Sequence, residues 1–142
     1  MKICIAYFSK FGNGKMAAEH LHGQLVKMGH IVVLHSADSI DPKLLPAMDM
    51  YVFSSPTHMG SPAGKMNRFL KKLALPEGSR YALMATYMGG KTNTLLKMEK
   101  ILAKKGYVKT HDGLELKVEG IQGPLAEGYK EFLDNFAHKL VK

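Results

Sequence analysis

The chain has 142 residues and is 46% hydrophobic and 23% charged, a size and composition that allow one buried core. Its one cysteine, Cys4, excludes an internal disulfide and a zinc site built on cysteines, and no apolar run approaches the roughly 18 residues of a membrane span. The net charge of +8 at pH 7 favours acidic partners, but the lysines are scattered and no nucleic-acid-binding module is recognisable. We therefore expect a cytoplasmic protein with no membrane insertion and no specific nucleic-acid partner.

Apolar runs bounded by turn signals alternate with helical patterns along the chain. Residues 2–8 are apolar on both faces, as expected of a central parallel strand that buries Cys4 as a small core side chain. A stripe of apolar residues at helical spacing predicts a helix over 13–28, which Gly29 ends. Further elements are predicted at 30–36 (strand), 41–48 (a brief helical turn), 49–55 (strand), 61–73 (helix), 80–87 (strand) and 92–105 (helix).

The second half of the chain completes an α/β pattern. In the helix predicted over 61–73, we expect Ser61 to be the cap and Pro62 the first helical residue. A fifth strand is expected within 106–120, where the polar composition indicates a sheet edge. A last helix is predicted from an apolar stripe made of Tyr129, Phe132, Leu133, Phe136 and Leu140. Five strands alternating with helices predict one domain over 1–142, with a parallel sheet covered on both faces.

Three loops of this predicted sheet are candidates for a binding site, because parallel α/β sheets bind ligands at the carboxyl ends of their strands. They follow the first, third and fourth predicted strands and read SKFGNGK, SSPTHMGSPAGKM and TYMGGKTNT. All three are rich in Gly, Ser, Thr and Asn, as loops that approach a ligand with their backbone often are.

The first loop resembles three phosphate-binding patterns to different degrees. The triphosphate loop G-x-x-x-x-G-K-[ST] fails at both ends, where Ser9 and Met16 stand, and Met16 has no hydroxyl for magnesium. The dinucleotide pattern G-x-G-x-x-[GA] is matched by Gly12, Gly14 and Ala17, but no acidic residue ends the second strand. A plain turn that starts a helix and holds no ligand stays open beside the third pattern.

In that third pattern, the stretch IAYFSKFGNGKMAAEHL resembles the phosphate loop of flavodoxins, [ST]-x-T-G-N-T after an aromatic-ended strand. Phe11 and Gly14 stand where typical flavodoxins carry threonines, and an aromatic residue at position 11 resembles the quinone-reductase branch of the superfamily. The resemblance implies that backbone N–H groups hold the phosphate of flavin mononucleotide (FMN) and that Asn13 caps the helix. The implied phosphate-loop residues are Ser9, Lys10, Phe11, Gly12, Asn13 and Gly14.

The second loop, SSPTHMGSPAGKMNRFL, resembles the flavin-ring loop of flavodoxin-like reductases. The shared positions are Pro56, Thr57, Gly60, Met66, Phe69 and Leu70, of which the last three are expected to pack in the core. The resemblance implies that the backbone here lines the flavin ring and that Gly60 belongs to the peptide that contacts flavin N5. The implied cofactor-binding residues are Pro56, Thr57, His58, Met59 and Gly60.

The third loop lies in ALMATYMGGKTNTLLKMEKIL, which resembles the family loop near the pyrimidine edge of the flavin. The implied cofactor-binding residues are Thr86, Tyr87, Met88, Gly89 and Gly90. The chain has no Trp, so Tyr87, His58 and Met59 are the available stacking groups, and the choice among them stays open. His58 is also a candidate proton source for the reduced flavin, beside its interpretation as a structural loop residue.

The resemblance extends over essentially the whole chain and implies a flavodoxin-like three-layer sandwich of the short-chain form, with a five-stranded parallel sheet in the order 2-1-3-4-5. It implies bound FMN and electron transfer. The seven histidines are dispersed, so no metal site is predicted, and the sequence shows no arrangement of catalytic residues. Two activities stay open: an electron carrier, which the small loops favour, and an NAD(P)H-dependent reductase of quinones or similar acceptors. A binding module with weak or lost flavin binding is a third possibility. The redox partner is expected to be an acidic protein or a small acceptor such as a quinone.

Overall fold

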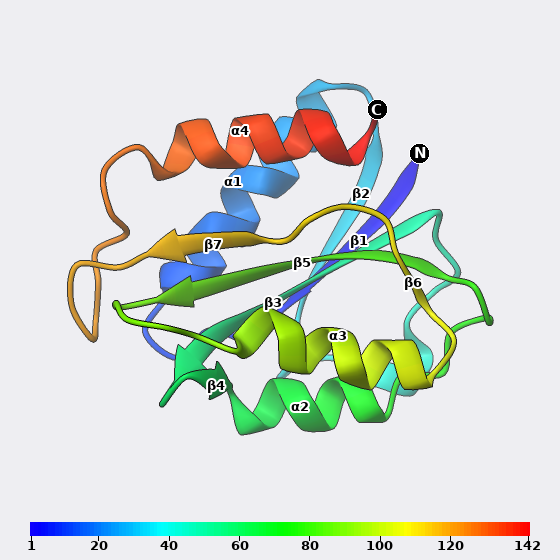
Figure 1. Cartoon of the computed structure of the whole chain (residues 1–142). Coiled ribbons are helices and arrows are strands. Elements are labelled where there is room, and N and C mark those ends of the chain that lie inside the picture. Colours follow the sequence, from blue (N-terminus) through cyan, green and yellow to red (C-terminus); the bar gives the residue numbers. More distant parts are fainter.

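A parallel β-sheet forms the middle layer of the computed structural model, which describes residues 1–142 (Figure 1). The strand order is β2-β1-β3-β5-β6, and β7 also pairs with β5 along the same edge. The strands span Lys2–Tyr7 (β1), Ile31–Ser36 (β2), Met50–His58 (β3), Arg80–Tyr87 (β5), Val108–Lys109 (β6) and Leu114–Lys117 (β7). Since β5 is the fourth predicted strand and β6 with β7 the fifth, the order 2-1-3-4-5 expected from the sequence is confirmed.

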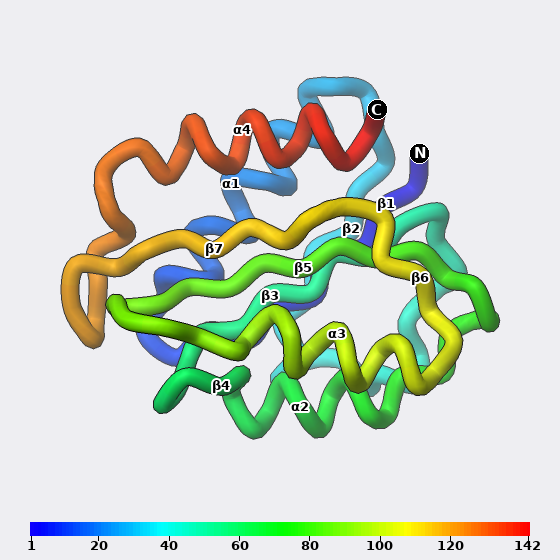
Figure 2. Tube along the Cα trace, in the orientation of Figure 1, coloured from blue at the N-terminus to red at the C-terminus, as the bar shows by residue number.

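Helices cover both faces of the sheet, which Figures 1 and 2 show edge-on as the middle of three layers. One face carries α1 (Asn13–Lys27) and α4 (Tyr129–Leu140), and the other carries α2 (Gly64–Lys71) and α3 (Thr94–Lys104). The brief turn predicted after β2 is a 3-10 helix over Pro42–Leu44. None of the helices is both long and apolar enough to span a membrane.

The central strand β1 is buried on both faces. Ile3 and Ile5 join the core beneath α1 and α4, whereas Cys4 and Ala6 join the core beneath α2 and α3. Burial raises the pKa of the Cys4 thiol to about 12, so this side chain stays protonated at neutral pH. Its interpretation as a small core residue is confirmed.

The edge strand predicted within 106–120 is divided in two. β6 lies beside the start of β5, and β7 lies beside its end. Between them Gly113 fits closely against α3 and β5, since a Cβ at this position would lie 2.8 Å from Leu95 Cδ1 and 3.1 Å from the carbonyl oxygen of Leu83. Only Leu116 of β7 is buried, which agrees with the polar edge expected from the sequence.

The predicted start of α2 is wrong. Ser61 and Pro62 do not cap a helix but form the two-residue strand β4 (Ser61–Pro62), which pairs antiparallel with the end of β3. The helix begins at Gly64 after Ala63, whose N–H donates to the Ser55 hydroxyl over 3.0 Å. This bond and the hairpin pairing stabilise an extended chain where the local sequence favoured a helix start.

Two details of α1 and α4 also differ from expectation. Asn13 does not cap α1; it is the first helical residue, and the cap position is Gly12, at φ 96° and without a side-chain bond. The Asn13 side chain instead packs against Gly123, where a Cβ would clash with the Oδ1 atom of Asn13.

In α4 the apolar stripe excludes Phe132, which is 57% exposed. The buried side of this helix is formed by Leu133, Phe136, Ala137 and Leu140.

Candidate functional site

A cleft lies where the parallel strands end, at the left edge of the sheet in Figure 1. It is a partly open cleft, with polar and apolar side chains in its walls. Segments after four strands contribute to it. The lining residues are Ser9, Lys10, Phe11, Asn13 and Gly14 after β1; Pro56, Thr57 and His58 of β3; Thr86, Tyr87 and Met88 around the end of β5; and Val118 and Ile121 after β7.

Most residues expected at a cofactor site meet in this cleft, and five do not line it. Gly12 shapes the first loop from outside the cleft, through its positive φ. Met59 and Gly60 form the turn between β3 and β4. Gly89 and Gly90 lie in the exposed loop after β5.

Sequence reasoning missed the fourth wall of the cleft, formed by Val118 and Ile121. Val118 forms an isolated bridge with Leu125, so the chain after β7 returns on itself beside the cleft. The signal was available, because the fifth strand of a parallel sheet ends at the same edge as the first, third and fourth.

The first loop presents hydrogen-bond donors in a fixed arrangement. The Ser9 hydroxyl oxygen accepts from the Gly12 N–H over 3.1 Å, which closes the turn before α1. The Met16 N–H donates to the Gly12 carbonyl over 2.9 Å and begins the helical ladder. The N–H groups of Asn13, Gly14 and Lys15 precede this bond and have no acceptor within the helix. Such a helix start attracts anions through its free donors and its dipole.

Gly14 is the buried member of this loop. A Cβ at this position would lie 3.4 Å from the Phe8 carbonyl oxygen and 3.6 Å from both Cβ and Oγ of Ser9. These are ordinary contact distances, so the backbone here passes close to Ser9 but leaves room for a small side chain. The backbone at Gly14 and the Ser9 hydroxyl therefore lie close together.

The second and third loops are joined by hydrogen bonds into one rim. The Thr57 and Thr94 hydroxyl oxygens lie 2.8 Å apart, and Thr94 is fully buried. The Asn93 N–H donates to the Gly60 carbonyl over 2.9 Å. On the outer side, the Thr92 hydroxyl donates to the carboxylate of Glu115 in β7 over 2.8 Å. The β3–β4 turn, the start of α3 and the edge strand are thus connected.

The β3–β4 turn contains the one residue other than glycine with a positive φ. Met59 has φ 52° and Gly60 has φ 77°, as required in the tight turn of a two-residue hairpin. Asn, Asp and Gly usually occupy such positions, and a side chain such as Met is strained there by about 1 kcal/mol. The Met59 side chain is fully exposed beside the cleft and gains no packing in return.

Of the three candidate stacking groups, Tyr87 and His58 line the cleft and Met59 does not. Tyr87, at the end of β5, and His58, at the end of β3, both line the cleft. Tyr87 is partly buried and His58 is exposed. Met59 lies outside the lining, so the cleft wall itself offers a phenol ring and an imidazole.

The family model described as flavodoxin matches residues 5–131, which is most of the chain. The chain belongs to the flavodoxin family. No curated protein sequence matches it. The family resemblance inferred from the three loops is thereby confirmed.

Solved structures of flavodoxins share the fold at low sequence identity. Flavodoxin 2 from Bacillus cereus is 24% identical with a TM-score of 0.84, and the similarity covers 99% of this chain and 98% of that one. The flavodoxin of Streptococcus pneumonia is 18% identical with a TM-score of 0.81, again over 99% and 98%. A flavodoxin from the domain Archaea is 18% identical with a TM-score of 0.77 over the full length of both chains.

FMN is the cofactor of the flavodoxin family and electron transfer is its activity, so the cofactor and function expected from the sequence are confirmed at the level of the family. The cleft of this chain has the chemistry that FMN needs. The first loop offers free N–H donors and the side chain of Lys10 at one end. The other walls present Pro56, Tyr87 and Val118, which suit a flat ring.

Proposed function

We propose that this chain is a one-electron carrier that holds FMN in the cleft at the carboxyl end of its sheet. The observation that carries the proposal is the set of free N–H donors of Asn13, Gly14 and Lys15 beside the Ser9 hydroxyl, at one end of a cleft walled by four loops. We further propose that residues 1–142 form one domain and that the protein is cytoplasmic, which the single buried cysteine supports.

The first loop would bind the phosphate. Because the Ser9 oxygen already accepts a hydrogen bond from the Gly12 N–H, the hydroxyl proton is free to be donated to a phosphate oxygen. The first-turn amides of α1 supply further donors without any rearrangement. Typical members have two more hydroxyls here, at positions 11 and 14, and each missing one lowers the affinity by about 1 kcal/mol.

The remaining walls would hold the ring. His58, Thr57 and Tyr87 lie on two neighbouring strand ends, which fixes the width of the cleft between them. When bound, FMN supplies the one-electron chemistry that no side chain of the protein can provide. The chain orients the ring, excludes part of the water around it and sets the charge it experiences.

A carrier, rather than a reductase with its own substrate, is supported by the exposed rim of the cleft. Met88 and Ile121 line the cleft yet remain largely exposed, which suits contact with a partner surface. We propose that the partner is an acidic redox protein, since the net charge of +8 favours association with a negative surface.

Titration of the purified chain with FMN tests the proposal. We expect quenching of flavin fluorescence with a micromolar or tighter Kd, and slow turnover when NADH or NADPH and a quinone are added to the loaded protein. Gly14→Asp places a carboxylate among the phosphate donors and should weaken FMN binding at least tenfold. Gly23→Asp places the same charge on α1 where a Cβ meets nothing within 4 Å, and it should bind FMN normally.

Each contrary result has a distinct meaning for the proposal. An absence of quenching at micromolar concentrations would exclude FMN as the ligand of this chain. Equal affinities of the two aspartate variants would exclude the first loop as the phosphate site. Rapid oxidation of NADH or NADPH by the quinone would identify a reductase instead of a carrier.

A further inference from the structure

The positive charge of the chain is concentrated in three segments. Residues 1–18, 50–76 and 78–98 contain ten Lys and Arg residues and no Asp or Glu. The rest of the chain has ten Lys and Arg residues and all twelve Asp and Glu residues, so its net charge is −2 while the three segments carry +10. These segments contain β1, β3, β5, the loops that follow these three strands and the whole of α2.

A trough crosses α2 from the mouth of the cleft. Its first part shares Lys10 and His58 with the cleft and also includes Lys65 and Arg68. Lys65 and Arg68 also line the second part of the trough, which continues along α2 to Lys72. We name it the α2 trough, and its ionisable residues are Lys10, His58, Lys65, Arg68, Lys72 and Asp38.

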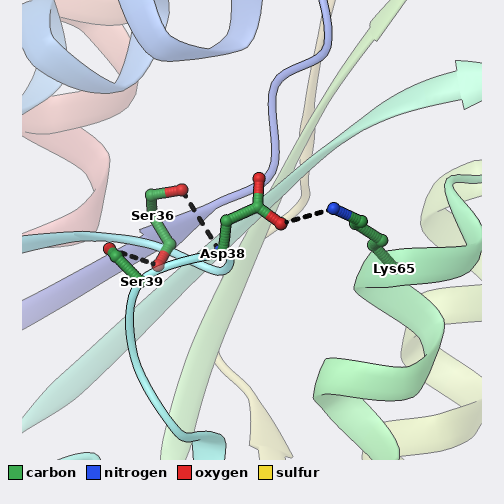
Figure 3. A network of polar contacts seen from close by, with 4 residues as sticks. All are labelled: Ser36, Asp38, Ser39 and Lys65. Carbon is green, nitrogen blue, oxygen red and sulfur yellow. Dashed lines mark hydrogen bonds and ion pairs between the residues drawn. The ribbon is translucent and has the colours of Figure 1, made fainter.

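One acidic residue, Asp38, lies in the α2 trough. Figure 3 shows its carboxylate pointing from the loop after β2 toward Lys65 of α2, with 2.9 Å between Oδ1 and Nζ. The Asp38 N–H donates to the Ser36 hydroxyl over 3.2 Å, which anchors this residue in the loop. Both members of the ion pair are about half exposed, so the pair is weak and exchangeable.

The other cations of the trough form no ion pair. Arg68 and Lys72 are exposed, and neither belongs to any of the three ion pairs of the molecule. The Arg68 guanidinium lies along the first turn of α2, since a Cβ on Gly64 would come within 3.3 Å of its Nη1 atom. A free guanidinium offers a planar set of donors that matches a carboxylate from another molecule.

The trough opens onto a rim with exposed apolar side chains. Phe11, Met59, Met88 and Ile121 come from four different segments, and all are largely exposed. Phe11, Met88 and Ile121 line the cleft itself. Met59 does not, but it is next in the chain to His58, which does. Protein interfaces commonly combine such an apolar centre with a charged periphery.

Resting on the function proposed above, we propose that an acidic redox protein docks with its carboxylates in the α2 trough and its apolar surface on the rim of the cleft. Because the trough meets the cleft at Lys10 and His58, this placement brings the partner to the edge of the proposed FMN site. Single-stranded nucleic acid is also an anion, but it needs exposed aromatic rings on which bases stack. The trough aromatics Phe8 and Phe69 are 9% and 4% exposed, so the trough itself gives bases no ring to stack on, and the exposed ring of Phe11 lies on the rim outside it.

A pair of charge-matched double variants tests the location. Arg68→Glu with Lys72→Glu reverses two charges in the trough, whereas Lys130→Glu with Lys139→Glu reverses two exposed charges on α4, across the sheet. Each double variant lowers the net charge from +8 to +4, because every reversal changes it by two. The probe is a rhodamine-labelled poly-glutamate peptide, added to the FMN-loaded full chain at low salt and followed by fluorescence anisotropy.

We expect the trough variant to bind the peptide about tenfold more weakly and the α4 variant to stay within about threefold of the unchanged protein. In amide NMR spectra, the peptide should shift signals of α2 and leave those of α4 in place. Equal weakening in both variants, or no binding by the unchanged protein, would overturn the proposal. Tighter binding of a single-stranded oligonucleotide of equal charge would overturn it in favour of nucleic acid.

The Kd for FMN, measured for all three proteins, separates this test from that of the proposed function. Neither double variant changes a residue that lines the cleft, so all three proteins should bind FMN equally. If the unchanged protein fails to bind FMN, the proposed function is wrong. If FMN binds normally and the peptide does not discriminate between the variants, only the docking surface is wrong.

Discussion

The Thr57 hydroxyl, on the wall of the cleft, lies 2.8 Å from the fully buried hydroxyl of Thr94 at the start of α3. Thr94→Val keeps the shape of the side chain and leaves Thr57 without this partner. We expect a loss of about 1 kcal/mol in the free energy of unfolding, because a polar group in a partly buried place loses its hydrogen bond. Urea denaturation of the FMN-free protein measures this.

The double variant Thr57→Val with Thr94→Val provides the control for that prediction. Removing both hydroxyls leaves no unpaired group, so it should be as stable as the unchanged protein or nearly so. A double variant that loses the sum of two single losses would show that the two hydroxyls act independently.

Restoring a hydroxyl in the first loop should tighten FMN binding. A Cβ at Gly14 meets its nearest atoms at ordinary contact distances, so Gly14→Ser can be built without displacing the loop. One added hydrogen bond of about 1 kcal/mol corresponds to roughly a fivefold lower Kd in a fluorescence titration. Gly14→Ala adds the Cβ alone and should leave the Kd within about twofold. Equal Kd values for the two variants would rule out phosphate binding by this hydroxyl.

Relieving the strain at Met59 should stabilise the fold. Met59→Asn puts a residue that tolerates positive φ into the β3–β4 turn, and no packing is lost because the Met59 side chain is fully exposed. We expect a gain of about 0.5–1 kcal/mol in urea denaturation. Met88→Asn removes an exposed methionine whose φ is not positive, and it should give no such gain. If the two variants have the same stability, the turn stores no strain.

The charge of the protein should raise the potential of its second one-electron reduction, in which a negative charge is added to the flavin. One unit charge about 10 Å away, in an effective dielectric of about 40, contributes roughly 0.8 kcal/mol or about 35 mV. Since the net charge is +8, we expect a potential tens of millivolts above that of acidic flavodoxins, decreasing as salt is added. Spectroelectrochemical titration at two salt concentrations checks this, and a potential equal to that of an acidic member would contradict it.

The periodicity of the sequence was enough to predict the layers of the fold. β1 is buried on both faces, so it reads as a continuous apolar run, and the buried residues of α1 recur at helical spacing. The start of α2 could not be predicted in this way, because Ser61 and Pro62 carry strong local signals for a helix start. Their pairing with β3 depends on Ser55 and Ala63, whose contact is a property of the folded chain.

Three of the four walls of the cleft could be predicted from the sequence. The loops after β1, β3 and β5 follow neighbouring parallel strands and carry residues of a known pattern, and they do meet at one cleft. Ile121 belongs to no such pattern, and its place beside the cleft depends on the return of the chain after β7. The packing of Asn13 against Gly123 is likewise long-range, so a cap was the natural but wrong expectation from the local sequence.

The hydrogen bond from the Asn93 N–H to the Gly60 carbonyl makes the β3–β4 turn and α3 mechanically dependent on each other. If the peptide that follows Gly60 rotates, this bond must open before the carbonyl oxygen can face a new donor. Lys97, one turn further along α3, also donates to the Ser61 hydroxyl. The start of α3 is therefore hydrogen-bonded to the hairpin at both Gly60 and Ser61. Any rotation of the Gly60 peptide would therefore also disturb the start of α3 and the contact between Lys97 and Ser61.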